Sequence, residues 1–317
     1  MNMGAKSPGE QRCCSGMNGE WAMTALSSRA TPDPPMTRPE PVGSCGLSSH
    51  PVGPLNLRTA LAEYVPVALH EMAHAALMDR CETKFLLPAA ALPQLLSALS
   101  AHYQVLIIGG QAVLPYRNLY LDTPEFDFYY AHHNGRARRY KVRFRSYEQT
   151  RTTFLEVKER CPSGRTIKTR ALVDQPQCPL PQVGTALVCG VPTRNQALEP
   201  KLWVNYSRIT LVGIGRPERV TLDLNLEFQM PAAEGSASVP AVHPENLVIV
   251  ELKRASARQS SPLEDYARAQ GFRSGSLSKY GVGCSLLYPV RHNAFKPQRL
   301  AMQRLAKLAM QYMEQSA

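Results

Sequence analysis

The chain has 317 residues, a formal net charge of +11 and a hydrophobic content of 44%. This composition predicts that most of the chain folds, and the positive charge indicates a polyanionic partner such as nucleic acid, a phosphorylated metabolite, an inorganic phosphate polymer or a membrane surface. No apolar run is long enough to cross a bilayer and the first residues offer no apolar signal segment, so we expect a cytoplasmic protein.

The eight cysteines are scattered, without a C-x-x-C pair or a histidine at zinc-binding spacing. Free thiols are therefore expected rather than a disulfide framework or a zinc site.

The N-terminal residues 1–56 are rich in Pro, Ser, Gly and Met and lack an apolar period. Such a segment buries too little surface to offset its ordering entropy, so it is predicted to be a disordered extension. We expect the folded domain at 57–291 and an amphipathic C-terminal helix at 292–317, which would dock on the domain or on a partner; binding to a membrane surface is the less favoured interpretation of this helix.

Residues 57–78 are predicted to form a helix interrupted by Pro66. The helix contains His70-Glu-Met-Ala-His74, which matches the H-E-x-x-H pattern of zinc proteases. We discount a protease, because no third ligand is evident and a Pro-rich segment, not a sheet, precedes the motif.

The strongest local pattern is the strand predicted at residues 139–147. Basic and apolar residues alternate along it, in the order Arg139, Tyr140, Lys141, Val142, Arg143, Phe144 and Arg145. One face of the strand is therefore cationic and the other apolar. Because cations on one face repel one another, a bound polyanion is indicated. For this strand alone, a solvated face that is basic by accident is an equal alternative.

Further stretches repeat this alternation, at 153–158, 165–170, 204–211, 219–228 and 247–253. In 219–228, the even-numbered apolar residues from Val220 to Phe228 are expected to face outward, while Arg219, Asp223 and Asn225 face inward. Strands with one charged and one apolar face suit a closed barrel with a polar lumen. We therefore predict an α+β fold, an antiparallel barrel of about eight strands with flanking helices and a cationic interior.

Short motifs in this order resemble the VTC domain, the polyphosphate polymerase branch of the CYTH-like triphosphate tunnel metalloenzymes. They are Arg80–Phe85, Tyr120–Thr123, Arg139–Tyr147, Phe154–Lys158, Thr166–Lys168, Asn205–Arg208, Arg219–Asn225, Glu251–Lys253 and Ser278–Gly281. The resemblance covers about Arg80 to Pro289. Hydrolytic tunnel enzymes begin with E-x-E-x-K, but here Arg80 replaces the first Glu, which favours the polymerase branch. His132 and Ser276 depart from the pattern, since relatives carry Arg and Lys there.

The resemblance implies that the ATP γ-phosphate is transferred to a growing polyphosphate chain with the help of Mn²⁺ or Mg²⁺. It implies catalytic roles for Lys158, Arg208 and Lys279, and metal binding by Glu251. The phosphate-binding residues that it implies are Lys84, Arg143, Arg145, Lys168, Arg219, Tyr206 and Ser278. Glu82 and Glu156 are expected to pair with neighbouring cations.

The partners implied by the resemblance are ATP and inorganic polyphosphate, with a separate membrane protein if the product is moved across a membrane. Nucleic acid is not expected, because the cations are not interleaved with stacking aromatic residues. A triphosphate hydrolase on the same fold and a non-catalytic polyphosphate- or nucleotide-binding module remain alternatives.

Overall fold

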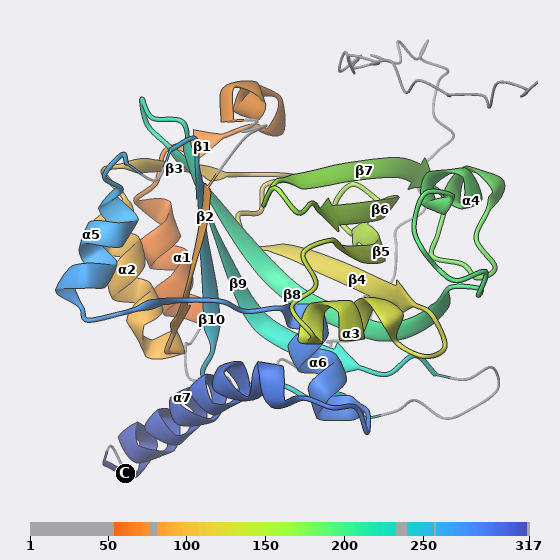
Figure 1. Cartoon of the computed structure of the whole chain (residues 1–317). Helices are drawn as coiled ribbons and strands as arrows, with labels where there is room; N and C mark the ends of the chain where they lie inside the picture. Colours follow the sequence, from red (N-terminus) through yellow and green to blue (C-terminus); the bar gives the residue numbers. More distant parts are fainter. Residues whose placement is uncertain (1–53, 76–80, 233–239, 257, 316–317) are drawn as a thin grey trace, which may run out of the picture. The chain divides into compact units, whose positions relative to one another are not determined.

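A large, mainly antiparallel sheet organises the molecule in the computed structural model, which describes residues 54–75, 81–232, 240–256 and 258–315 (Figure 1). Of the predicted N-terminal extension, residues 1–53 lie outside the described part. The described residues form eleven strands: β1 Pro66–Val67, β2 Cys81–Leu87, β3 Tyr103–Leu106, β4 Leu114–Asp122, β5 Arg139–Tyr147, β6 Thr152–Arg160, β7 Thr166–Val173, β8 Glu199–Gly213, β9 Glu218–Gln229, β10 Val248–Arg254 and β11 Ser274–Gly275.

The strands pair in the order β11-β2-β10-β9-β8-β4-β5-β6-β7, and β3 pairs with both β8 and β1. The antiparallel sheet with flanking helices confirms the predicted α+β class. The closed barrel was wrong: in the described part of the chain the sheet is open, because its end strands β11 and β7 do not pair with each other. Closure of a barrel requires a continuous ladder of strands. Strand β11 at one end of the sheet has only two residues with which to form such a ladder.

The sheet is strongly curved. In a flat sheet, β2 and β6 would lie roughly 29 Å apart, because six strand spacings of about 4.8 Å separate them. Nevertheless, the charges of Lys84 on β2 and Lys158 on β6 lie close enough for Lys158 to lower the pKa of Lys84. The face that carries these two lysines is therefore concave, and we call it the charged face.

The helices are α1 Pro54–Ala62, α2 Leu92–Leu99, α3 Asp127–His133, α4 Gln182–Val188, α5 Pro262–Ala269, α6 Lys279–Leu287 and α7 Lys296–Gln315, with 3-10 turns η1 Leu69–Ala75, η2 Ala89–Ala91 and η3 Asn293–Phe295. Helices α1, α2 and α5 cover the convex face of β2, β8, β9 and β10 through one apolar cluster (Figure 1). A second cluster joins α3 and α4 to the convex face of β4, β5 and β6. Among the described residues, no helix combines the length and apolarity needed to span a bilayer.

Helix α6 packs on the opposite side of the sheet, against the apolar end of the charged face. A Cβ on Gly283 would lie 2.5 Å from the Leu202 side chain and 2.7 Å from the Phe228 ring. Tyr280 donates a 2.6 Å hydrogen bond to Asp122, whose oxygens also accept from the backbone at the start of α3. These close contacts fix α6, and with it the residues at its N-terminus.

A β-bulge corrects the predicted alternation along residues 219–228. The register between β8 and β9 shifts at Asn205/Ser207, and Asn225 adopts a left-handed φ of 51°. The extra residue reverses the facing of everything beyond it. Val220, Leu222 and Leu224 pack beneath α1, α2 and α5 as predicted, whereas Leu226 and Phe228 join the cluster around α6.

The helix predicted at 57–78 was wrong from residue 63 to residue 75, and residues 76–78 lie outside the described part. Helix α1 ends at Ala62, Pro66 lies in β1, and the H-E-x-x-H residues lie in the 3-10 turn η1. At three residues per turn, positions i and i+4 do not share a face, so the local geometry does not favour joint metal binding by His70 and His74. Glu71 accepts a 2.7 Å hydrogen bond from the Ala68 backbone, which is a turn-capping role. The side chain of His74 lies outside the described part.

Candidate functional site

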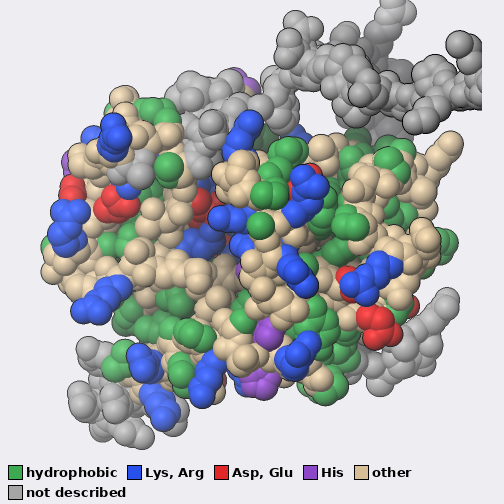
Figure 2. All heavy atoms as spheres, viewed as in Figure 1, with side chains coloured by type: hydrophobic (Ala, Val, Ile, Leu, Met, Phe, Trp, Pro, Cys, Tyr) green, Lys and Arg blue, Asp and Glu red, His purple; other side chains and the backbone are tan. Residues whose placement is uncertain are grey.

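The charged face brings the predicted site residues together. In Figure 2, Lys and Arg side chains gather around a central hollow, with acidic side chains between them. Strand pairing and side-chain contacts connect this face from β2 to β7, and α6 adds two residues at its first turn. The predicted residues found here are Lys84, Arg143, Arg145, Lys158, Lys168, Tyr206, Arg208, Arg219, Glu251, Ser278 and Lys279.

Glu156 on β6 anchors one group of cations. Its side chain is only 2% exposed and accepts from the Nε and Nη2 of Arg143 at 2.9 and 2.7 Å and from Lys168 at 2.5 Å. Arg145 lies 4.0 Å from the same carboxylate. Burial alone would raise the pKa of Glu156, but the three cations hold it well below its usual range. The expected pairing of Glu156 with neighbouring cations is confirmed.

Asp223 on β9 anchors a second group. Arg208 donates hydrogen bonds from Nε and Nη2 to this carboxylate, at 2.6 and 2.9 Å, and Lys279 of α6 donates a third at 2.5 Å. Despite burial, these cations keep the pKa of Asp223 well below normal. The bidentate geometry fixes the guanidinium plane of Arg208, and Lys279 joins the first turn of α6 to the sheet.

Glu251 on β10 is the third anchor. Its carboxylate accepts from Lys253 at 2.8 Å and from Lys84 at 3.5 Å, and Lys84 also pairs with Glu82, as predicted. Burial raises the pKa of Glu251, but Lys253, Lys84 and Arg208 outweigh it and hold the pKa well below its usual range. Burial also lowers the pKa of Lys253 to about 7.

The metal that the family implies can be tested against this donor set. Among the described residues, no group of three or more His, Cys, Asp or Glu side chains is arranged to hold a metal ion. Mg²⁺ often uses one or two protein carboxylates together with substrate phosphates and water. Glu251 is ionised, as a ligand must be, and it lies among the cations that would hold such phosphates. The chain therefore fits a metal that is bound jointly with a substrate.

Aromatic rings from β4 and β8 lie beneath the cations, contrary to the expectation that the cations lack such neighbours. Arg145 and Arg208 lie 5.5 and 5.0 Å from the ring centre of Tyr116, and Arg143 lies 5.6 Å from that of Tyr120. The Tyr206 hydroxyl accepts from Arg145 at 3.1 Å. All three rings are buried, so they support guanidinium groups by cation–π contact and offer no open face to a base.

Lys141 on β5 completes the site and was not among the predicted binding residues. It lies opposite Lys158 in the strand register and donates a 3.0 Å hydrogen bond to Ser278, the N-cap of α6. Burial and the charges of Lys158, Arg143, Lys84 and Arg139 place its pKa well below the usual value. The alternation along β5 marked Lys141 as facing this side, but only the fold shows that it meets α6.

Asp223, Lys253 and Asn118 are also parts of the site, although none of them was among the predicted binding residues. Asn118, in the middle of β4, accepts from Arg145 at 2.8 Å. The alternation in β9 and β10 was the available signal for Asp223 and Lys253. For Asn118, a buried polar residue between Arg117 and Leu119, the sequence offers no comparable signal.

His132 and Ser276, the two residues that depart from the family pattern, lie in different surroundings. His132 on α3 lies near Lys141, Arg139 and Arg160, and burial together with these cations lowers its pKa to about 3. It is therefore neutral at pH 7 and cannot supply the charge of an arginine. Its Nδ1 is buried without a hydrogen-bond partner among the described atoms. Ser276 is exposed, just before α6.

Several solved structures resemble the chain with low identity. An adenylate cyclase candidate from Bacillus halodurans is 16% identical, with a TM-score of 0.42, and the match covers 63% of this chain and 94% of that one. A protein from Pyrococcus horikoshii is 12% identical, with a TM-score of 0.37 and coverage of 64% and 97%. An adenylyl cyclase candidate from Hippeastrum, described as having a dominant triphosphatase activity, is 18% identical, with a TM-score of 0.37 and coverage of 68% and 100%.

No curated protein matched the chain in sequence. A family model does match: the VTC domain aligns with residues 79–179 and 191–288. These two segments contain β2 and β4–β10 together with α6, and thus every residue of the charged face described above. Because the match spans the greater part of the chain, the chain belongs to the VTC domain family.

Proposed function

We propose that this protein transfers the γ-phosphate of ATP to the end of a growing inorganic polyphosphate chain. A terminal phosphate oxygen of the chain attacks the γ-phosphorus, the bond from that phosphorus to the β,γ-bridging oxygen breaks, and ADP leaves. The observation that carries the proposal is the curved, cation-rich face that runs from β2 to β7 and continues onto α6. Phosphoryl transfer needs mainly positioning and charge neutralisation, which such a face supplies.

The carboxylates of the charged face support this role because they orient the cations, and the cations outnumber them, so a positive charge remains. Glu156 and Asp223 each hold two or more cations by short contacts. Guanidinium groups held in this way keep further N–H donors for phosphate oxygens. We assign phosphate binding to Lys84, Arg143, Arg145, Lys168, Arg219, Tyr206 and Ser278, and contact with the reacting phosphate to Lys158, Arg208 and Lys279.

Glu251 would hold Mn²⁺ or Mg²⁺ together with the substrate. When bound, such an ion neutralises phosphate charge and polarises phosphoryl oxygens. Lys84 and Lys253 pair with the same carboxylate, which places these two ammonium groups where they could also contact phosphate oxygens.

The experiment that tests the proposal incubates the purified full chain with ATP and either Mn²⁺ or Mg²⁺, and analyses the products on a polyphosphate gel. A ladder of polyphosphate with ADP in proportion is expected. Release of orthophosphate without a ladder would establish a triphosphate hydrolase instead. Polyphosphate binding without ATP turnover under any divalent ion would establish the non-catalytic module, for which the neutral His132 is the feature to examine first.

A further inference from the structure

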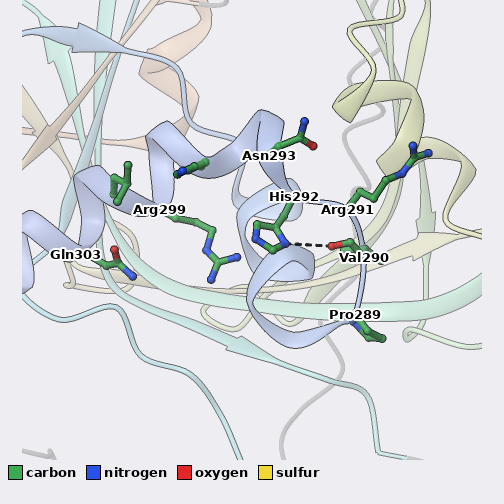
Figure 3. Close-up of a pocket in the computed structure, with 9 residues that line it drawn as sticks. Pro289, Val290, Arg291, His292, Asn293, Arg299 and Gln303 are labelled. Carbon is green, nitrogen blue, oxygen red and sulfur yellow. Dashed lines mark hydrogen bonds between the residues drawn. The ribbon is translucent and has the colours of Figure 1, made fainter.

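A second concentration of basic side chains lies outside the charged face, at the junction of α6 and α7. A surface pocket of about 710 Å³ is lined there by Arg291, His292, Lys296 and Arg299, with the amides of Asn293 and Gln303 (Figure 3). The charged face contributes none of its residues to this pocket. Ser278 and Lys279 are at the first turn of α6, whereas the pocket is lined by residues that follow its last turn. Gln298 of α7, which does not line the pocket, accepts a 3.1 Å hydrogen bond from the Ser278 N–H.

The pocket differs from the charged face in having no acidic counterpart. From residue 266 to residue 313, the sequence contains no Asp or Glu. Among the ion pairs of the described residues, none includes Arg291, Lys296 or Arg299. On the charged face, by contrast, Glu156, Asp223 and Glu251 each anchor cations. No described carboxylate therefore forms an ion pair with the cations of the pocket.

The walls of the pocket are held in place by buried contacts. Phe295, 2% exposed, lies so close above Gly281 that a Cβ there would clash with its ring. The Tyr129 hydroxyl donates to the Arg291 carbonyl at 2.8 Å, and His133 shares a 2.6 Å hydrogen bond with Asn293. Arg299 donates to the Ser285 carbonyl at 3.0 Å. In Figure 3, His292 and Arg299 lie on the same side of the turn that leads into α7, whereas Arg291 points away from them, and its guanidinium lies 5.4 Å from the centre of the Tyr130 ring.

We infer that this pocket is a second binding site for phosphate groups, separate from the proposed catalytic face. A guanidinium group such as that of Arg299 binds phosphate oxygens with paired N–H donors, and a lysine such as Lys296 adds a compact charge. The volume exceeds that of a single orthophosphate, so the pocket has room for several phosphates or for a phosphate on a larger body. Two sources share this chemistry: a free oligophosphate, and the headgroup of an anionic lipid, since Leu300 at the pocket is 40% exposed.

The test uses Lys296→Glu in the full chain, with Lys307→Glu as the matched control. Both lysines are exposed on α7 and both changes alter the net charge equally, but Lys307 does not line the pocket. A carboxylate in the first turn of a helix is favourable, so Lys296→Glu should fold; its unfolding temperature checks this. One arm titrates inorganic tripolyphosphate by calorimetry, and the other measures cosedimentation with phosphatidylserine vesicles.

If the ligand is a free oligophosphate, calorimetry should find two tripolyphosphate sites in the wild type and in Lys307→Glu. In Lys296→Glu the second site should be lost, or its affinity should fall at least tenfold. A lipid headgroup predicts vesicle binding with the same dependence on Lys296. If neither arm distinguishes Lys296→Glu from Lys307→Glu, the site does not exist. Because polymerisation by the charged face enters neither arm, failure of this inference would leave the proposed activity untouched.

Discussion

Two lysines share the carboxylate of Glu251, and this arrangement determines what its replacement should do. Glu251→Gln keeps the size of the side chain and removes the charge that would hold a metal. Metal-dependent ATP turnover should fall by about 100-fold or more. Binding of polyphosphate without metal should persist or tighten, because Lys84 and Lys253 are freed and a repelling carboxylate is gone. Turnover assays and metal-free titrations measure the two effects.

Glu227→Gln provides a control for this substitution. Glu227 lies on β9 beyond the bulge, where it accepts from Asn205 at 2.7 Å and has no contact with the cations of the charged face. The same chemical change there should leave turnover and polyphosphate affinity within about twofold of the wild type, as expected for a distant surface change. Intact turnover in Glu251→Gln would remove Glu251 from the metal site.

Lys168 gives the site a dependence on pH that can be predicted with its sign. Burial, partly offset by Glu156, lowers its pKa to about 8. Lys168 is therefore charged below pH 8 and loses its proton as pH rises through that value, well before an ordinary lysine would. Affinity for tripolyphosphate should decline between about pH 7.5 and 9. Lys168→Arg stays charged throughout this range, so its affinity should show a smaller decline in the same titrations; equal declines would rule out Lys168 as the cause.

At the scale of elements, the position of α6 depends on two glycines that no sequence pattern marked as packing residues. Alanine normally stabilises a helix by about 1 kcal/mol relative to glycine. At Gly283 the added methyl would meet Leu202 and Phe228, and overpacking of this kind costs about 1–3 kcal/mol. Gly283→Ala should therefore lower the free energy of unfolding, measured in denaturant, and reduce turnover by displacing Ser278 and Lys279.

The control for this prediction is Gly190→Ala, because a Cβ at Gly190 meets no atom within 4 Å and its φ is ordinary. That variant should match or slightly exceed the stability of the wild type. If Gly283→Ala were as stable as Gly190→Ala, α6 would not be held by the close approach seen at Leu202 and Phe228.

The strands were predictable where alternation is regular, and were misjudged where the backbone departs from it. The strand expected at residues 139–147 coincides with β5 because basic and apolar residues alternate there without a break. On β9 the sequence continues the alternation through Leu226 and Phe228, but the backbone forms a bulge at Asn225. Asn tolerates a left-handed φ better than most residues, which was the one local signal of the bulge.

Most residues of the charged face could be placed there from the alternation along the strands, but Asn118 and the pairing of side chains could not. Charged faces identified which side chains meet, since all residues on one face of a strand point the same way. Which carboxylate holds which cation depends on the register between paired strands, as for Glu156 and Arg143 on consecutive strands and for Glu251 and Lys84 on strands distant in sequence. The contribution of α6 depends on tertiary packing, and closure of the sheet depends on the lengths of its end strands; neither is encoded in a local period.

For the molecule as a whole, the curvature of the sheet brings like charges together across the charged face. Lys141, Lys158 and Lys84 come from β5, β6 and β2, and each of the latter two lowers the pKa of Lys141. This concentration of charge opposes folding when no anion is bound, and a bound polyphosphate would relieve it. The same feature that prepares the site for its ligand should therefore reduce the stability of the free protein.

Lys141→Met tests this relation, because it keeps the length of the side chain and removes the charge. A lysine whose pKa is lowered in the folded state destabilises the fold at pH 7, by about 1.4 kcal/mol for each tenfold loss of proton affinity. Loss of its bond to Ser278 offsets roughly 1 kcal/mol, and because the pKa of Lys141 lies well below its usual value, the ligand-free variant should be more stable than the wild type. Denaturant unfolding measures this difference.

Adding tripolyphosphate should reverse the order of stability. A ligand at 100 times its dissociation constant stabilises the folded state by about 2.7 kcal/mol, and the wild type should gain more than Lys141→Met, which binds the anion less tightly. Lys307→Met, the same change at an exposed position of α7, should leave both measurements near those of the wild type. The opposite result is a Lys141→Met protein that is less stable than the wild type without ligand and is stabilised as much as the wild type by tripolyphosphate. That result would show that Lys141 stabilises the fold through its bond to Ser278 and that its charge does not destabilise it.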